Sequence, residues 1–264
     1  MKPAIHQSQL EMLTGKCSAM YEFRYVQGIK VPPGIAVHAG TGVHAGAAED
    51  YRSKQANGHL LATDELENTA VEAFEAALEK DGAIEDTPDA RGDALDRTVK
   101  LARLHHSHVA PFHEPADVEK SFRLELNGFP IDVVGTIDLL ESNGDLSDVK
   151  TSGKSPSESI VHSSVQLSAY ALAANVMRGL PPETEVNVRL DYLVDTKTPK
   201  HAPLESSRNI IDAQNFLQRV ELANKLIESG IFPPTSPSNW VCSERYCGYY
   251  KDVCPFGRRG RSRA

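Results

Sequence analysis

Two short alternating segments joined by a tight turn constrain the fold of this chain more than any other feature. Much of 131–141 alternates apolar and polar side chains with a period of two, as half-buried β-strands do, and residues 145–150 form a second, shorter strand pattern. Between them stand Ser142, Asn143 and Gly144, which are residue types that favour turns. The pattern predicts a β-hairpin near the middle of the chain.

The length of this turn decides where two aspartates point. A two-residue Asn-Gly loop would pair Asp138 with Val149 and send Asp138 and Asp148 to opposite faces. A three-residue loop with Gly144 in the left-handed conformation is a common hairpin connection, and it sets Asp138 directly opposite Asp148. We predict this register or an equivalent bulge. Because side chains two apart in a strand share a face, Lys150 joins Asp148 there.

Opposed carboxylates repel each other, so this arrangement needs a reason. At about 4 Å and an effective dielectric constant near 20, the repulsion is about 4 kcal/mol. A divalent cation such as Mg²⁺ or Mn²⁺, which prefers oxygen ligands, would remove the conflict. Lys150 would then supply a positive charge beside an attacking water or a developing phosphoryl charge. The alternative is a surface salt bridge between Asp148 and Lys150, with Asp138 exposed on the solvent face.

The rest of the chain contains helical patterns first and then a mixture of strands and helices. We expect helical positions across 5–30, helices at about 42–58 and 63–81, a polar loop at 85–93 and a further helix to about 105. After these we expect strands at 122–128, 131–141 and 145–150, a helix at 159–177, a strand at 187–196 and a helix at 208–229. This order predicts an α/β fold with a mixed central sheet flanked by helices.

No internal repeat and no convincing linker interrupts the chain, so we expect one domain over 1–264. Within it we expect an N-terminal helical region, a helical insertion at about 60–110, a C-terminal cysteine-rich segment and a disordered basic tail at 257–264.

Composition narrows the functional classes. The net charge of −8 argues against non-specific wrapping of nucleic acid by the whole surface, although it leaves room for a local basic groove. No apolar run reaches the length of a membrane helix, and the N-terminus has no apolar signal core. We therefore expect a cytoplasmic protein with no membrane association, in which disulfides are improbable.

The central motifs resemble a known family. GTIDLL at 135–140, SDVKTS at 147–152 and QLSAY at 166–170 are similar to the PD-(D/E)XK nuclease core in its RecB-type exonuclease branch. Upstream, GTGVHAGAAE resembles the Gly-x-x-x-His element of the same branch, with Gly40 and His44 in its positions. Many relatives carry glutamate where this chain has Asp148, a change that the pattern allows. The likeness extends from about residue 8 to 256 and implies a restriction-endonuclease-like core.

The resemblance also implies roles for individual residues. His44, Asp138 and Asp148 would coordinate Mg²⁺ or Mn²⁺ with help from the carbonyl oxygen of Val149. Lys150 would position or activate the nucleophilic water. Two further residues would orient the site or contact the DNA strand: Gln166 and Tyr170, which share one helix face.

A function follows from these roles as an expectation. The family implies a metal-dependent DNA exonuclease that acts on single-stranded DNA or on free ends, in a bacterial cell or a phage-infected host, beside recombination or replication proteins. One alternative is a nuclease-like fold that serves as a DNA-binding or assembly module. Another is an RNA-cleaving enzyme, since no feature of the sequence recognises or rejects a 2′-hydroxyl group.

Four cysteines form a further candidate site. Cys242, Cys247 and Cys254 follow a C-x4-C-x6-C spacing, and Cys17 lies far upstream. In RecB-type nucleases, including CRISPR-associated members, one early and three late cysteines often hold a 4Fe–4S cluster that staples the chain ends together, and the resemblance implies the same here. Four thiolates also suit tetrahedral zinc, and four buried thiols are the third interpretation.

A histidine-rich run, His105, His106, His108 and His113, offers another arrangement with the spacing of a zinc site. We favour a solvated loop for this run.

Overall fold

The computed structural model describes residues 2–84 and 86–259 of the chain. Two compact units divide it: one comprises Met1–Pro32, Arg123–Gly135 and Ile211–Ala264, and the other comprises Pro33–Phe122 and Thr136–Ile210. We call them unit 1 and unit 2. No helix among the described residues has the length and apolar character to cross a membrane. Of the predicted tail, residues 257–259 lie in a short helix, and 260–264 fall outside the described residues.

A mixed sheet supports the fold, as predicted, and it has six strands among the described residues rather than the four that we expected. Its strand order is β1-β3-β4-β5-β6, with β2 paired to β3. The β1–β3 and β4–β5 pairs are parallel, and the β3–β4 and β5–β6 pairs are antiparallel. The strands are β1 (Ala4–His6), β2 (Pro115–Leu124), β3 (Asp132–Glu141), β4 (Leu146–Ser152), β5 (Val186–Val194) and β6 (Lys200–Arg208).

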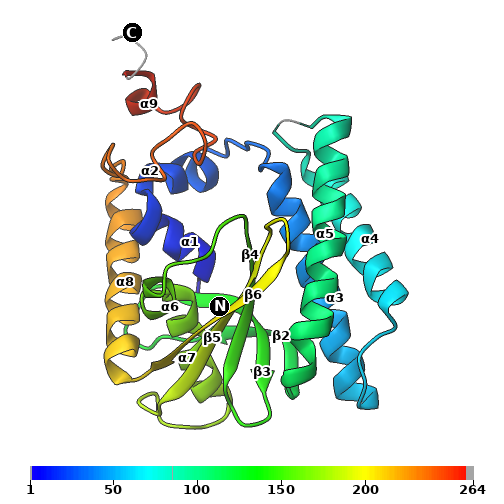
Figure 1. Ribbon diagram of the computed structural model, residues 1–264. Helices are drawn as coiled ribbons and strands as arrows, with labels where there is room; N and C mark the ends of the chain where they lie inside the picture. Colours follow the sequence, from blue (N-terminus) through cyan, green and yellow to red (C-terminus); the bar gives the residue numbers. More distant parts are fainter. Residues whose placement is uncertain (1, 85, 260–264) are drawn as a thin grey trace. The chain divides into compact units, whose positions relative to one another are not determined.

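Unit 2 contains the helices from α3 to α7 and strands β4, β5 and β6. Its long helices α3, α4 and α5 lie side by side in Figure 1 and share an apolar cluster that includes Ala39, Phe74 and Ala94. The helices of unit 2 are α3 (Ile35–Asn57), α4 (Thr63–Asp81), α5 (Pro88–His108), η3 (Ala110–Phe112), α6 (Ser159–His162) and α7 (Val165–Met177).

Unit 1 contains the two ends of the chain. Strand β1, which we did not predict, begins this unit. After it, the predicted helical stretch 5–30 is broken into short α-helical and π-helical turns. The helices of unit 1 are α1 (Gln7–Glu11), η1 (Met12–Lys16), α2 (Ser18–Tyr21), η2 (Glu22–Val26), α8 (Ile210–Ser229) and α9 (Pro255–Arg259).

Helix α3 begins at Ile35, earlier than the residue near Gly42 that we predicted, because its glycines serve packing rather than helix initiation. A β-carbon on Gly42 would stand 2.5 Å from the carbonyl oxygen of Ala70 on α4 and 2.7 Å from a methyl carbon of Thr98 on α5. Gly42 therefore lets the backbone of α4 and the Thr98 side chain of α5 approach α3 closely. Helix α4 matches the predicted 63–81 range, and Gly82 with φ of 63° ends it.

Three other predicted elements need correction. The helix expected at 159–177 is two helices, because Ser164 is extended and its hydroxyl accepts a hydrogen bond from Leu167 N at the start of α7. The strand expected at 122–128 is β2, which begins and ends earlier, since residues 127–128 form a turn. Strand β6 was missed because Pro203 argues against a strand, and here it is tolerated at the sheet edge.

The two faces of β4 and β5 are covered by different helices of unit 2. Val149 and Leu193 pack with Val43 of α3 and Leu101 of α5 in one apolar cluster. Asp148 and Lys150 point to the opposite face because side chains alternate along a strand. Helix α7 contributes Gln166 to that second face.

Candidate active site

The central hairpin has the three-residue turn that we predicted. Leu139 pairs with Ser147 and Leu140 with Leu146. At the turn, Glu141 N donates to Asp145 O at 2.9 Å, and Gly144 has φ of 94°. Continued along the ladder, this register sets residue 138 opposite residue 148. This register therefore brings the two carboxylates to one face of the hairpin.

Asp148 lies at the buried end of this site. Its side chain is inaccessible to solvent, with Lys150 Nζ 2.6 Å from Oδ2 and Gln166 Nε2 donating to Oδ1 at 2.8 Å. Lys150 Nζ also donates to Gln166 Oε1 at 3.0 Å. The three side chains form a closed polar network between β4 and α7. The alternative of a surface salt bridge is wrong because Asp148 is buried.

Tyr170 extends this network along α7. Gln166 Nε2 lies 2.6 Å from the Tyr170 hydroxyl oxygen. The Tyr170 ring is buried and meets Phe122 edge-on, with the ring centroids 6.0 Å apart. Burial and the nearby charge of Asp148 raise the pKa of Tyr170. A buried, neutral tyrosine in this position orients Gln166.

The charges of the site influence one another strongly. Burial, followed by the charge of Asp138, raises the pKa of Asp148 to about 6. Burial opposes the charge of Lys150, but Asp148 and Asp138 raise its pKa above the ordinary value. Burial likewise opposes a charged His44, yet the hydrogen bond and charge of Asp138 raise its pKa. The site thus concentrates negative charge that a cation would stabilise.

A metal-capable group lies at the open end of the site. One ligand atom each from His44, Glu119 and Asp138 lies within 4.8 Å of the others. His44 Nδ1 is 3.2 Å from Asp138 Oδ2. Apart from these contacts with Lys150 and His44, the buried Oδ2 atoms of Asp148 and Asp138 have no hydrogen-bond partner among the described residues. This donor set of carboxylate oxygens and an imidazole suits Mg²⁺ or Mn²⁺.

Glu119 was missed by the sequence analysis. It follows no motif, and it comes from β2 rather than from the hairpin. Glu119 is the one non-glycine residue with a positive φ among the described residues, at 49°. Such a conformation is strained and persists where the surroundings impose it, often at functional sites. Burial and the charge of Asp138 raise the pKa of its carboxyl group. Only the tertiary contact with Asp138 and His44 could reveal this residue.

Val149 was predicted to offer its carbonyl oxygen to the metal. Its side chain is buried in the cluster with Leu193, on the face opposite Asp148. The role of its carbonyl oxygen stays a prediction.

The four cysteines meet in unit 1. All four are free thiols, and they line one small hollow together with Phe23, Tyr250 and neighbouring residues. Cys247 and Cys254 are buried in an apolar cluster with Ala19, Phe23 and Tyr249. Burial, and then the other thiols, raise the pKa of Cys242. The chain thus brings one early and three late thiols to one place.

The spacing of these thiols bears on their ligand. Zinc bound by four thiolates has Zn–S bonds of about 2.3 Å, so its sulfur atoms must lie within about 4 Å of one another. In the described part of the chain, no three cysteine sulfurs lie within 4.8 Å. A four-iron cluster is wider than a single ion and needs wider spacing.

The histidine-rich run forms neither a solvated loop nor a zinc site within the described residues. His105 is buried, 3.0 Å from the Tyr51 hydroxyl oxygen, and burial lowers its pKa to about 3. His106 Nδ1 lies 2.9 Å from the buried carboxylate of Asp50. These histidines hold α5 against α3 because each ring meets a polar partner on that helix.

His113 instead joins an ionic cluster on the face of β5 opposite the candidate active site. Its Nδ1 lies 2.9 Å from Glu141 Oε1, and its Nε2 lies 3.3 Å from Asp191 Oδ2. Burial opposes its charge, but the hydrogen bonds and charges of these carboxylates raise its pKa to about 9. His113 is therefore charged at neutral pH.

Asp191 is the centre of this cluster. Its Oδ1 accepts hydrogen bonds from Arg189 Nε at 2.7 Å and His201 Nε2 at 2.6 Å, and its Oδ2 accepts one from Ser147 Oγ at 2.5 Å. Burial opposes ionisation, but the hydrogen bonds of His113 and His201, the charge of His113 and the hydroxyl of Ser147 hold the pKa of Asp191 far below its usual range. The cluster joins β4, β5 and β6.

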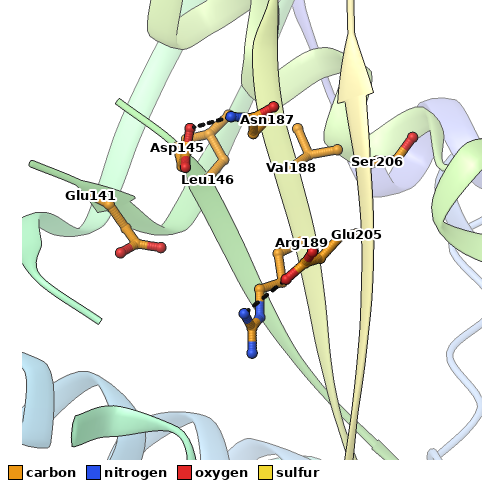
Figure 2. Close-up of a pocket in the computed structure, with 8 residues that line it drawn as sticks. All are labelled: Glu141, Asp145, Leu146, Asn187, Val188, Arg189, Glu205 and Ser206. Carbon is orange, nitrogen blue, oxygen red and sulfur yellow. Dashed lines mark hydrogen bonds and ion pairs between the residues drawn. The ribbon is translucent and has the colours of Figure 1, made fainter. Parts of the chain in front are cut away.

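A hollow of about 320 Å³ lies beside this cluster, over β4, β5 and β6 (Figure 2). Its polar side chains bind one another. Arg189 Nη1 donates to Glu205 at 3.0 Å, and Asn187 Nδ2 donates to Asp145 at 3.0 Å. These contacts link neighbouring strands. Among the residues that line the hollow, we find no pair of facing carboxylates like Asp138 and Asp148.

Comparison with known proteins agrees with the geometry. The family model described as the PD-(D/E)XK nuclease superfamily matches residues 6–255. A solved structure from Eubacterium rectale, described as "Putative exonuclease", is similar with a TM-score of 0.58 and 11% identity, covering 95% of this chain and 89% of that one. The structure of SSO0001 has a TM-score of 0.43 and 16% identity, covering 97% and 88% of the two chains. No curated protein matches the chain.

Proposed function

Because the chain belongs to the PD-(D/E)XK nuclease superfamily, we propose that it is a metal-dependent deoxyribonuclease that degrades single-stranded DNA from free ends. The observation that carries the proposal is the pair of carboxylates on one face of the hairpin with Lys150 beside them. A protein of about 5–15 kcal/mol stability has little reason to keep this repulsion without a function. We further propose that it works in the cytoplasm, where its thiols stay reduced.

The residues of the site have complementary roles in this proposal. His44, Glu119, Asp138 and Asp148 would hold one or two Mg²⁺ or Mn²⁺ ions, with the carbonyl oxygen of Val149 as a further ligand. A bound cation would activate water and stabilise charge on the phosphoryl oxygens.

Lys150 would place its ammonium group beside the attacking water and the scissile phosphate. The water oxygen would attack phosphorus while its proton passes to solvent, the opposite P–O bond would break, and the leaving oxygen would take a proton from solvent. Gln166 holds both Lys150 and Asp148 in place, and Tyr170 holds Gln166. This support is valuable because an error of about 1 Å in position can cost about a hundredfold in rate.

The exonuclease assignment and the preference for single strands have indirect support. The motifs resemble those of RecB-type exonucleases, and a structural neighbour is described as an exonuclease. Two alternatives make different predictions: a DNA-binding or assembly module would bind without cleaving, and an RNA-cleaving enzyme would prefer RNA.

We also propose that Cys17, Cys242, Cys247 and Cys254 hold a 4Fe–4S cluster. The single hollow that these four thiols line and the resemblance to RecB-type nucleases support this proposal. Anaerobically purified protein should be brown and contain iron and acid-labile sulfide. Protein that binds zinc stoichiometrically and contains no sulfide would contradict the cluster.

The nuclease proposal is tested with labelled single-stranded DNA, duplex DNA and RNA, with Mg²⁺, Mn²⁺ or a chelator. We expect metal-dependent cleavage of single-stranded DNA that requires a free end. Lys150→Ala should reduce cleavage by at least about a hundredfold, as loss of a transition-state contact does, while circular dichroism stays unchanged. The control is Lys197→Ala, which removes an exposed lysine. Cleavage by Lys150→Ala at the wild-type rate would overturn the assignment of the site.

A further inference from the structure

An exposed aromatic pair lies in the cysteine-rich segment of unit 1. Trp240 is 64% exposed and Tyr246 is 51% exposed. Their ring centroids are 5.1 Å apart and the ring planes cross at 85°. An edge-to-face contact covers at most one face of one ring, so flat aromatic surface remains open. We call Trp240, Arg245 and Tyr246 the aromatic patch.

The backbone around Trp240 is held in a defined turn. Ser243 Oγ donates to the Trp240 carbonyl oxygen at 3.0 Å, and Val241 N donates to Asn239 Oδ1 at 3.1 Å. The Val241 side chain is buried, next to the exposed indole. The ring is therefore presented by an ordered segment, which lowers the entropy that a ligand must remove on binding.

The aromatic patch also carries positive charge. The guanidinium of Arg245 lies 5.4 Å from the centre of the Tyr246 ring. A second pair in unit 1 repeats this arrangement, with Arg24 5.7 Å from the ring centre of the exposed Tyr25. Neither arginine forms an ion pair with a carboxylate in the part of the chain that the structure describes. Their donors are available to an anion.

We propose that the aromatic patch binds unpaired bases of single-stranded nucleic acid by stacking, while Arg245 contacts the phosphate backbone. Open aromatic faces beside arginine are the combination that binds single strands without sequence preference. A protein partner would favour a larger continuous apolar surface. Paired bases in a duplex are already stacked and present no free face to the patch. The inference rests on the proposed nuclease function and identifies residues that would hold its single-stranded substrate.

The binding test uses the full chain with Lys150→Ala and a chelator, so that the DNA stays intact. Fluorescence anisotropy of a labelled oligothymidine strand gives the affinity. Trp240→Ala should weaken binding about tenfold or more, and Trp240→Phe should restore most of it. Phe112→Ala, which removes another highly exposed aromatic ring from unit 2, is the matched control and should leave affinity unchanged.

An abasic strand separates stacking from charge. Trp240→Ala should leave the affinity for abasic phosphodeoxyribose unchanged, whereas Arg245→Ala should weaken binding of both strands. Ultraviolet crosslinking of a 5-iodouracil strand should label Trp240 or Tyr246, as identified by mass spectrometry. Equal loss of affinity for both strands with Trp240→Ala, or no loss at all, would overturn the proposal.

These outcomes are separable from failure of the nuclease proposal. If wild-type protein cleaves DNA and Trp240→Ala binds it normally, the proposal for the aromatic patch is wrong and the nuclease proposal is supported. If base-dependent binding and crosslinking occur but wild-type protein cleaves no strand, the proposal for the aromatic patch is supported and the nuclease proposal is wrong. Crosslinks confined to other residues would reject the patch in either case.

Discussion

Replacing His113 with glutamine tests the ionic cluster most directly. The charged ring bridges Glu141 and Asp191, and its pKa in the folded protein is about 9 against an ordinary value of 6.5. One pKa unit corresponds to about 1.4 kcal/mol, so the charged ring contributes at most about 3.5 kcal/mol to the free energy of unfolding. The lowered pKa of Asp191 reports the same attraction and adds no separate contribution.

The sign of the pH dependence follows from the raised pKa. The folded protein binds the His113 proton more tightly than the unfolded chain does. The contribution is therefore complete below pH 6.5, decreases as the pH rises, and is lost above pH 9. The difference in the free energy of unfolding between the wild type and His113→Gln should therefore decrease from pH 6.5 to pH 9. Asp191 keeps Arg189, His201 and Ser147 in the variant, so its charge stays paired.

Thermal unfolding followed by circular dichroism measures the effect. Below pH 6.5 the wild type should unfold roughly 5–10 °C above His113→Gln, and the difference should shrink above pH 9. The control is His162→Gln, because His162 is exposed and bonds a serine hydroxyl rather than a carboxylate. A His113→Gln difference that is equal on both sides of the range would refute the reasoning.

Two further predictions address packing and the metal site. Gly42→Ala should destabilise the protein by about 1–3 kcal/mol, because its β-carbon would overlap backbone of α4. Gly92→Ala on α5, where a β-carbon meets nothing within 4 Å, should stabilise the protein by about 0.5–1 kcal/mol. Urea unfolding measures the free energy of unfolding of both variants, and equal effects would contradict the packing argument. Glu119→Gln should weaken Mn²⁺ binding by about 10–100-fold in calorimetry, while Glu125→Gln should leave it unchanged. Unaltered affinity in Glu119→Gln would remove Glu119 from the metal site.

Strands β4 and β5 carry two clusters of charged side chains, one on each face of the sheet. On one face, Asp148 and Lys150 meet Gln166 in the candidate active site. On the other, Ser147 and Asp191 belong to the ionic cluster. The two arrangements share adjacent residues of one strand, because alternate side chains point in opposite directions. The ionic cluster therefore fixes the strands from which the side chains of the candidate active site project.

Local features of the sequence determined the hairpin. The turn residues and the period of two set Asp138 opposite Asp148 without reference to the rest of the chain, since hairpin register depends on short-range turn geometry. Helix α4 was equally predictable because its apolar periodicity and Gly82 act locally. The resemblance to a nuclease family rested on such local motifs.

Tertiary structure alone decided the remaining features. Glu119 joins His44 and Asp138 through contacts between distant segments, and no local pattern marks it. His113 became a buried charged bridge rather than part of a solvated loop because Glu141 and Asp191 stabilise it in a place where burial alone would neutralise it. A sequence pattern reports periodicity and turns, whereas the ionisation and ligand role of a side chain depend on partners that only folding brings near.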